Sequence, residues 1–413
     1  MRQISKALTH CRERFPALTR PGAPVFLDNP GGTQAPREVI EAMTEYLSYG
    51  SSNVGGAFAV SERTDAVIKE AHEAMADFVG AQHPEEVSFG ANMTSLTFSL
   101  SRALARELRE GDEIVLTNLD HDANVAPWLL LARDLGLEVR WADINPEDCT
   151  LDIQSFQDAL SERTRIAAFT YASNAVGAVN DVRRLTRMAH DAGALVYIDA
   201  VQYAPHGLMD AREIDCDFLV CSPYKFFGPH AGVLYSRLDH SERLEAYKVR
   251  PAKDAPPHKW ETGTGNFEAM AGTAAAVEYL ASLAPENSGT SRRERLEAAM
   301  LEISSYEEGL SRQLIEGLQQ LPVQIHGIQD MDRLYQRVPT FAITAESQSP
   351  RELATAMGKR GYNLWNGNYY ALVLMERLGL EDSGGALRIG MAHYNTPDEV
   401  SSFVTDLGEV LRS

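Results

Sequence analysis

The sequence has little that points outside the class of globular proteins. It holds no internal repeat, no low-complexity tract and no apolar run near the roughly 20 residues that a membrane-spanning helix needs. Basic residues number only 38 against 58 acids, which gives a formal net charge of −20. A chain this acidic repels nucleic acid and anionic membranes as a whole, so neither is an expected partner. Any anionic ligand must meet locally arranged donors.

Cysteine is also scarce, and one nucleotide-binding motif is missing. The four cysteines (Cys11, Cys149, Cys216, Cys221) form no CxxC pair, so neither a zinc site nor a disulfide framework is expected. Free thiols buried in a cytoplasmic protein are the expected arrangement. No GxGxxG follows the first predicted strand, which argues against a nicotinamide-binding interpretation of the α/β pattern described below.

Short apolar runs alternate with helical patterns over residues 85–236, which predicts an α/β fold with a mostly parallel sheet. The expected strands are 86–90, 113–118, 138–143, 165–172, 195–200, 218–222 and 232–236. After residue 283 the pattern changes to a long amphipathic helix (292–321), shorter strands and two further helices, as in a small α+β domain. With 413 residues the chain is long enough for two cores.

The first twenty residues hold five basic side chains and one acid, Glu13, as some organellar transit peptides do. The run Phe15-Pro16-x-Leu18 favours a different interpretation, in which a helix ends and docks on the core.

Two chemically useful residues follow neighbouring predicted strands. The strand 195–199 ends in Asp199, with Gln202 three residues on, and the strand 218–222 is followed by Pro223-Tyr224-Lys225. Ligands of parallel sheets bind beyond the carboxyl ends of the strands. A lysine there is partly desolvated, which lowers its pKa as Schiff-base chemistry requires.

Pyridoxal 5'-phosphate (PLP) needs such a pair: a lysine for its aldehyde and a carboxylate for its ring nitrogen. His121, after the strand 113–118, can stack on the ring. Asn92-Met93-Thr94-Ser95 precedes a predicted helix and suits a phosphate, and Ser222 adds a hydroxyl. Each residue alone has a structural explanation, such as a helix cap or a solvated lysine. Their joint occurrence after different strands favours PLP.

Seven ordered motifs together resemble the class V aminotransferase-fold enzymes, and in particular cysteine desulfurases of the SufS type and selenocysteine lyases. The resemblance covers nearly the whole chain and rests on these runs: Arg12-x-x-Phe15-Pro16-x-Leu18, Asp120-His121-x-x-Asn124, Ser173-Asn174-x-x-Gly177, Asp199-x-x-Gln202, Ser222-Pro-Tyr-Lys225-x-x-Gly228-Pro229, Glu261-Thr262-Gly-Thr264-x-Asn266 and Leu387-Arg388-Ile-Gly. It implies PLP fold type I, with a seven-stranded sheet in a large domain (21–283) and a small domain formed by 1–20 and 284–413.

The resemblance also implies roles for individual residues. Lys225 forms the Schiff base and shuttles protons, Asp199 pairs with the ring nitrogen and His121 stacks. Arg388 grips the substrate carboxylate, which its bidentate fork suits. The other implied contacts are Asn174 and Gln202 to the ring oxygen, Thr94, Ser95 and Ser222 to the phosphate, Thr264 to the phosphate of a second subunit, and Tyr224 where relatives commonly have histidine.

The sulfur-handling half of the pattern is missing. Desulfurases carry Gly-His-His-Cys-Ala in a mobile loop, and the corresponding segment here is Gly367-Asn-Tyr-Tyr370-Ala371. Tyr370 stands in the cysteine's place, and a phenol is neither a soft nucleophile nor a persulfide carrier. Desulfurases also carry a His-Arg pair in a substrate loop, where this chain has Asn53-Val-Gly-Gly56.

The leading hypothesis is a C–S or other β-elimination lyase acting on an α-amino acid, with Tyr370 or Tyr203 as a possible general acid. Alternatives are a class V aminotransferase or epimerase, a desulfurase that uses an external thiol, and a PLP-binding protein without turnover. The pattern also implies a homodimer with shared active sites. The substrate side chain is expected to depend on residues 53–59, Trp365 and Tyr369.

Overall fold

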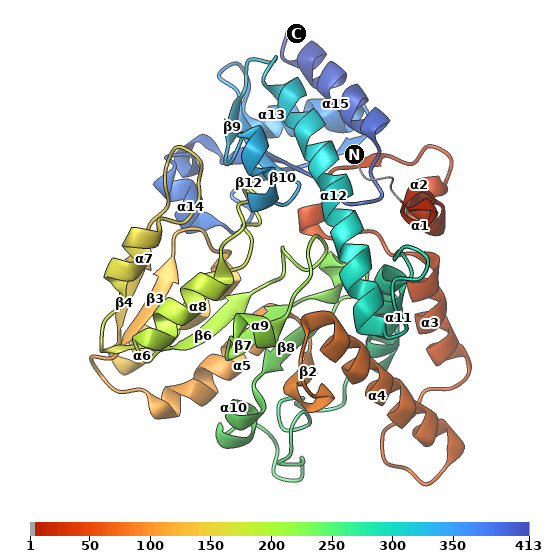
Figure 1. Ribbon diagram of the computed structural model, residues 1–413, viewed down its shortest axis with the longest axis vertical. Coiled ribbons are helices and arrows are strands. Elements are labelled where there is room, and N and C mark those ends of the chain that lie inside the picture. The colour runs from red at the N-terminus through yellow and green to blue at the C-terminus, as the bar shows by residue number, and fades with distance from the viewer. Residues whose placement is uncertain (1–4, 413) are drawn as a thin grey trace.

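The computed structural model describes residues 5–412 and centres on a seven-stranded sheet (Figure 1). The strands lie in the spatial order β2-β8-β7-β6-β5-β3-β4. Within the described residues, six of these strands run in one direction and β8 runs against them. Their bounds are β2 Val87–Gly90, β3 Glu113–Thr117, β4 Glu138–Ala142, β5 Thr164–Thr170, β6 Leu195–Asp199, β7 Phe218–Cys221 and β8 Gly232–Ser236. The predicted α/β fold is confirmed, with each strand within two residues of its expected bounds.

Helices cover both faces of this sheet, because successive strand residues point to opposite sides. On β6, Val196 and Ile198 belong to the core on one face, and Tyr197 belongs to the core on the other. The first face is covered by α4 (Ala59–Val79), α8 (Val182–Asp191) and α11 (Phe267–Ala281), and the second by α5 (Met93–Leu104) and α6 (Ala126–Leu135). Burial on both faces explains why the strands are continuously apolar in sequence.

A smaller four-stranded antiparallel sheet follows, in the order β12-β13-β10-β9. Its strands are β9 Gln324–His326, β10 Thr340–Thr344, β12 Trp365–Gly367 and β13 Ala386–Gly390, with α13 (Pro350–Lys359) and α15 (Pro397–Val410) beside it. The long helix α12 (Arg292–Leu318) runs from this sheet to α11 (Figure 1). It ends three residues before its predicted end, because Leu321 precedes Pro322 and is therefore disfavoured in a helix.

The segment around Phe15 docks on the core, as its sequence predicts. Phe15 is fully buried, with its ring 5.4 Å from that of Tyr279 and 4.8 Å from that of Tyr394. Leu8 and Leu18 join the same apolar cluster, which also includes side chains of the large sheet. The division into a 21–283 domain and a 1–20 plus 284–413 domain stays a prediction.

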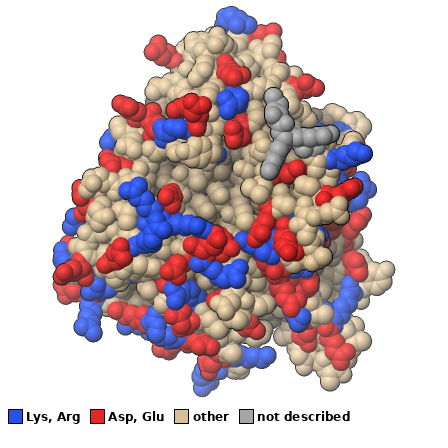
Figure 2. Space-filling view, viewed as in Figure 1, with Lys and Arg blue, Asp and Glu red and all other residues tan. Residues whose placement is uncertain are grey.

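The structure shows where the charged side chains and the four cysteines lie. On the face in Figure 2, acidic and basic side chains are interspersed. All four cysteines are buried and unpaired. Among residues 5–412, no helix combines the length and apolar character needed to cross a membrane, and no cluster of three metal-binding side chains occurs.

A buried carboxylate, Asp217, contacts β6 and two helices. It lies at the opposite end of the sheet strands from the predicted ligand-binding residues. It lies 2.9 Å from His190 Nε2 and 2.6 Å from His240 Nε2, and it accepts from the Val196 amide at 2.7 Å. Burial pushes the pKa of Asp217 up, but hydrogen bonds with the two histidines outweigh it and hold that pKa well below its usual range. The hydrogen bond to Asp217 raises the pKa of His190.

Replacing Asp217 by asparagine is expected to cost about 3 kcal/mol of stability, because it breaks a buried pair. A carboxyl group whose pKa falls on folding stabilises the folded state above its unfolded pKa, and this stabilisation is lost as pH falls. A histidine whose pKa rises on folding stabilises the folded state below about pH 6.5, and this stabilisation is lost as pH rises. The loss in melting temperature should therefore be largest between about pH 4 and 6.5.

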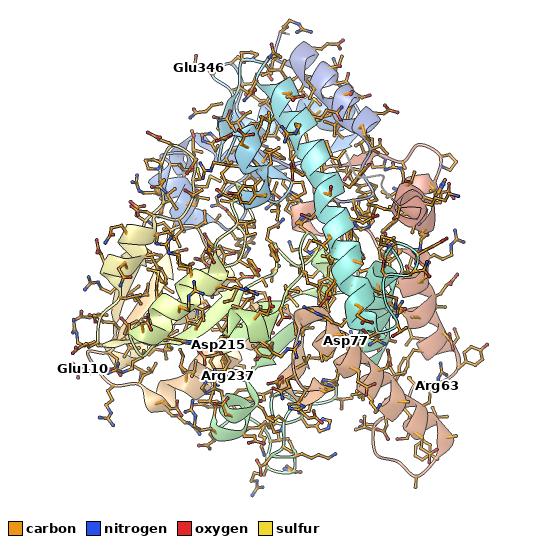
Figure 3. The ribbon with its side chains drawn as sticks, viewed as in Figure 1. Arg63, Asp77, Glu110, Asp215, Arg237 and Glu346 are labelled. Atoms are coloured by element: carbon orange, nitrogen blue, oxygen red, sulfur yellow. The ribbon has the colours of Figure 1, made fainter. Side chains whose placement is uncertain are left out.

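The nearby surface pair Arg237–Asp215, at 3.4 Å, provides the control (Figure 3). Arg237→Gln removes two half-exposed ion pairs, with Asp215 and with Asp239, and should change the melting temperature little at any pH. Equal losses for Asp217→Asn at pH 5 and pH 9 would contradict the assigned linkage.

Candidate active site

A cavity of about 900 Å³ lies at the carboxyl ends of the central strands. Thr170 and Asp199 are the last residues of β5 and β6, and Lys225 follows β7 within a short helical turn. Nine of the predicted site residues line this cavity: Thr94, His121, Asn174, Asp199, Gln202, Tyr224, Lys225, Tyr370 and Arg388. Residues far apart in sequence therefore meet in one place.

Lys225 and Asp199 have the electrostatics that a cofactor lysine and its partner acid require. Burial, reinforced by the charge of Arg388, lowers the pKa of Lys225 to about 7. Its Nζ donates to the carbonyl of Pro30. Burial raises the pKa of Asp199 to about 6, while the Val201 amide, donating at 2.9 Å, and Lys225 oppose that rise. At neutral pH Asp199 is thus largely anionic, and about half of Lys225 is a nucleophilic amine.

The rate at which the cofactor-free protein captures an aldehyde is expected to follow this pKa. Below about pH 7 the ammonium predominates and cannot attack, so capture should speed up as pH rises and level off above about pH 7. Stopped-flow absorbance at a series of pH values would measure it. Asp199→Asn, which removes the charge that raises the lysine pKa, should move the midpoint down. A midpoint near 10 would contradict the burial effect.

His121 is held as a neutral ring at the cavity wall. Burial lowers its pKa to about 4, and Lys225 and Arg388 add to that effect. Its Nδ1 accepts from the Ala123 amide at 3.0 Å, which leaves the ring proton on Nε2. Behind it, Asp120 accepts from Asn124 at 2.7 Å, and Asn124 in turn accepts from Trp128 at 3.0 Å. This buried chain fixes the turn that presents the ring.

The predicted phosphate residues are only partly together. Asn92 caps α5 by accepting from the Ser95 amide at 2.9 Å, and Ser95 Oγ donates back to the Asn92 carbonyl. Ser95 is therefore occupied by the cap and does not line the cavity, whereas Thr94 does. Ser222 is fully buried and its hydroxyl has no partner among the described residues. Ser222 does not line the cavity either, so Thr94 alone of the three predicted phosphate residues does.

The two predicted ring-oxygen contacts have their amide nitrogens engaged with the protein. Asn174 donates to the Tyr369 carbonyl at 2.9 Å, and its own side-chain oxygen is buried without a partner. Gln202 donates to Thr340 Oγ1 at 3.1 Å.

Arg388 lies beside the loop formed by residues 367–371. Its Nη1 donates to the Asn174 carbonyl at 2.9 Å, and its guanidinium stacks on the Tyr369 ring at 4.5 Å. Its Nε is buried without a partner. Burial lowers the pKa of Arg388 to about 10, so the group stays charged at neutral pH. A buried, under-used guanidinium is suited to a carboxylate.

Tyr369 and Tyr370 both have positive φ, at 55° and 59°, which non-glycine residues rarely adopt. The Asn174 contact holds Tyr369 in place, and the Asp122 amide holds Tyr370 by donating to its carbonyl at 2.6 Å. The Tyr370 ring stacks on His121 with centroids 5.5 Å apart. The loop thus places a phenol, 71% exposed, over the cavity.

Three other predicted residues lie apart from the cavity lining. Asn53 is exposed and bonds within its own loop, accepting from Val54 at 2.9 Å. Thr264 is exposed in the segment before α11. Tyr203 stacks on Tyr171 with centroids 3.7 Å apart and does not reach the cavity, so the structure gives no support to its role as a general acid.

Sequence reasoning missed several residues of the site. Asp122 and Glu381 both line the cavity. Gly31 also lines it, and a Cβ there would lie 2.4 Å from Trp365 Nε1, so the wall requires glycine. Behind Gln202, buried His206 pairs with Glu307 at 2.8 Å. The doublet Gly31-Gly32 was a readable turn signal, but nothing in sequence links His206 to Glu307, 101 positions away.

These features fit PLP. The cavity offers an amine with a lowered pKa, a buried anion and a neutral aromatic ring, and it has orphaned polar atoms on Asn174 and Arg388. Fold and site together define an enzyme of the PLP-dependent α/β class.

Comparisons with known proteins give the family. The model of the class V aminotransferase family matches residues 25–403, and this chain belongs to that family. The aminotransferase-like protein FGM3 of Gibberella zeae is 30% identical over 425 residues, covering 100% of both chains. The cysteine desulfurase of Cronobacter sakazakii is 29% identical, covering 99% of both. An apo cysteine desulfurase from Thermococcus onnurineus NA1 has a TM-score of 0.88 and 26% identity, covering 100% of this chain and 99% of that one.

The family, the fold and these relatives confirm four expectations. The chain is a cysteine desulfurase-like enzyme, it has the PLP fold type I, it is PLP-dependent and it is catalytic. The roles of individual residues stay predictions.

Proposed function

We propose that this protein is a PLP-dependent lyase that eliminates a β-substituent from an α-amino acid without a cysteine nucleophile. One observation carries the proposal: the cavity has Lys225, Asp199 and Arg388 together but no thiol among its lining residues. All four cysteines are buried elsewhere, and burial raises the pKa of Cys11 to about 12 and that of Cys149 to about 11. Such thiols are unreactive.

The cofactor, when bound, supplies an aldehyde for the substrate amine and a ring that absorbs negative charge from Cα. Arg388 binds the substrate carboxylate and thereby orients the bond from Cα to hydrogen. Lys225, with its pKa of about 7, removes the proton from Cα and later returns one. Asp199 would supply the negative charge that pairs with the ring nitrogen of a bound cofactor, and His121 would supply a neutral ring to stack on it.

Departure of the β-substituent requires a proton at the leaving atom. Tyr370 is the proposed donor, since its side chain lines the cavity and makes no hydrogen bond to any described residue. The neighbouring Tyr369 hydroxyl is instead occupied, because it donates to the Ala386 carbonyl. Tyr370→Phe should therefore slow elimination from substrates with poor leaving groups more than from those with good ones.

Product analysis with a β-substituted amino acid such as S-methylcysteine tests the proposal. Elimination yields pyruvate and ammonia in equal amounts, together with the thiol. Transamination instead yields the keto acid of the intact substrate and needs an amino acceptor, and epimerisation yields only the enantiomer. With cysteine and an added thiol, alanine in place of pyruvate would indicate desulfuration and overturn the proposal. If no amino acid changes the absorption spectrum of the bound cofactor, a PLP-binding protein without turnover would be favoured.

We also propose a cytoplasmic homodimer that shares its active sites. Thr264 lies outside its own chain's cavity and is exposed, as a residue that reaches a second subunit's phosphate would be. Glu261 anchors this segment by accepting from the Phe89 amide at 2.9 Å. Exposed apolar side chains gather along 40–60: Ile40, Leu47, Tyr49, Val54, Phe58 and Val60. Sedimentation analysis would measure the oligomeric state. A monomer that keeps full activity would refute the dimer.

A further inference from the structure

We propose that this cavity selects amino acids whose side chain carries a positive charge. The inference rests on the proposed lyase function and names its substrate class. One cavity contains Arg388, whose Nε has no partner, and two acids, Asp122 and Glu381, that have no cationic partner among the described residues. The inference rests on this juxtaposition.

The other charged groups of the cavity are not partners of these two acids. Lys225 lies near Asp199, and each shifts the pKa of the other. His121 is neutral at pH 7 because burial lowers its pKa to about 4. Arg388 is 5% exposed and its Nε has no partner, so this end of the cavity awaits an anion. What is left over is negative: Asp122 and Glu381.

Asp122 has no structural use for its carboxylate. It makes no hydrogen bond or ion pair with any of residues 5–412, although burial raises its pKa. A first-turn acid often caps a helix, but here the cap is His121, whose Nδ1 accepts from the Ala123 amide. Only the backbone of Asp122 is engaged, through the Tyr370 carbonyl. The carboxylate of Asp122 is therefore available to a cation that a ligand supplies.

Glu381 borders the same loop from the other side. Both of its oxygens accept from Asn368 Nδ2, at 3.0 and 3.2 Å, and no described cation approaches it. The amide contact orients the carboxylate and leaves its charge unbalanced. Asp122 and Glu381 are thus attached to successive parts of residues 368–370.

Aromatic rings complete the proposed subsite. Tyr370 and Trp365 line the cavity and are 71% and 52% exposed. A cation held over such a ring gains a further attraction. A substrate with its carboxylate at Arg388 and a cationic side chain toward Asp122 and Glu381 would pair the charges of all three residues. An acidic side chain would instead meet two like charges.

Three probes of similar size test the inference: S-(2-aminoethyl)cysteine, the neutral S-propylcysteine and the acidic S-carboxymethylcysteine. For the cationic probe, Lys225 takes the Cα proton, the Cβ–S bond breaks, and its electron pair and a proton go to sulfur. Water then converts the three-carbon product to pyruvate and ammonia. The balance is S-(2-aminoethyl)cysteine plus water giving pyruvate, ammonia and 2-aminoethanethiol, with no external oxidant or reductant.

The cationic probe is expected to exceed the neutral one about five- to tenfold in kcat/KM, and the acidic probe to be the poorest. Asp122→Asn and Glu381→Gln should each reduce the ratio of kcat/KM for the cationic probe to that for the neutral probe about threefold. The preference should also shrink with added salt. Asp382→Asn is the matched control, because Asp382 is exposed, lies outside the cavity lining and carries the same charge.

Binding measured by the change in cofactor absorbance separates this inference from the proposed function. Elimination from all probes at equal rates, with no effect of Asp122→Asn or Glu381→Gln, overturns the inference and leaves the lyase intact. A cationic preference in binding without pyruvate from any probe overturns the lyase and supports the subsite. Preference that falls equally in the Asp382→Asn control would reflect net charge alone and overturn the inference.

Discussion

Replacing Lys225 by alanine is expected to lower kcat/KM by about 10³-fold or more, the largest effect of any single change. The substitution would remove both proposed roles of Lys225, the covalent attachment of the cofactor and the base that moves the Cα proton. Burial lowers the pKa of Lys225 to about 7, which suits an amine that takes up and returns a proton at neutral pH. Borohydride treatment followed by peptide mass analysis should find the cofactor fixed to residue 225 in the native protein and absent in the variant.

Lys259 provides a matched control. It is also a buried lysine, 6% exposed, whose pKa burial lowers, but it donates to the Glu242 carbonyl at 2.9 Å and lies outside the cavity. Lys259→Ala should keep the cofactor linkage and most of the activity. If borohydride fixed the cofactor to another lysine, the assignment of Lys225 would be wrong.

Replacing Arg388 by lysine is expected to lower kcat/KM for amino acids by about 10²- to 10³-fold, mainly through KM. Lysine keeps the charge but not the planar fork, and it loses the stack on Tyr369 and the bond to the Asn174 carbonyl. The effect should be specific to the carboxylate. A primary amine that lacks a carboxylate should bind the native enzyme and the variant equally, as spectral titration would show.

Equal losses for the amino acid and the amine would mean that Arg388 supports the loop and does not grip the substrate. Melting temperature distinguishes a third outcome, because a variant that unfolds early would lose both ligands and the cofactor together.

The fold was largely readable from sequence. Alternating apolar runs gave the seven strands of the large sheet, because strands buried on both faces must be apolar along their whole length. The proximity of Asp199, which ends β6, and Lys225, which follows β7, was predictable for a related reason. Parallel strands bring their carboxyl ends to one edge of the sheet. The direction of β8, which opposes its neighbours, was not readable, because the same apolar pattern serves either direction.

The wall of the site depended on contacts between distant segments. Asp122 and Glu381 are 259 positions apart, and the loop 367–371 brings them to one cavity. Ser95 reads as a phosphate residue in sequence, yet the Asn92 cap occupies it. Tyr203 reads as a possible acid, yet its ring packs on Tyr171. Local sequence cannot specify which of two competing contacts a side chain makes.

The sequence by itself determined the residue types on which the predicted chemistry rests: Asp199 and Lys225 after neighbouring strands, the ring of His121 and the absence of cysteine in residues 367–371. Those are properties of residue type and of order along the chain. Only the tertiary structure decided how the cavity is charged, because pKa shifts, unpaired carboxylates and the under-used Arg388 arise from burial and from neighbours distant in sequence. Electrostatics inside a protein depend on distance and desolvation, and neither is written in the order of residues.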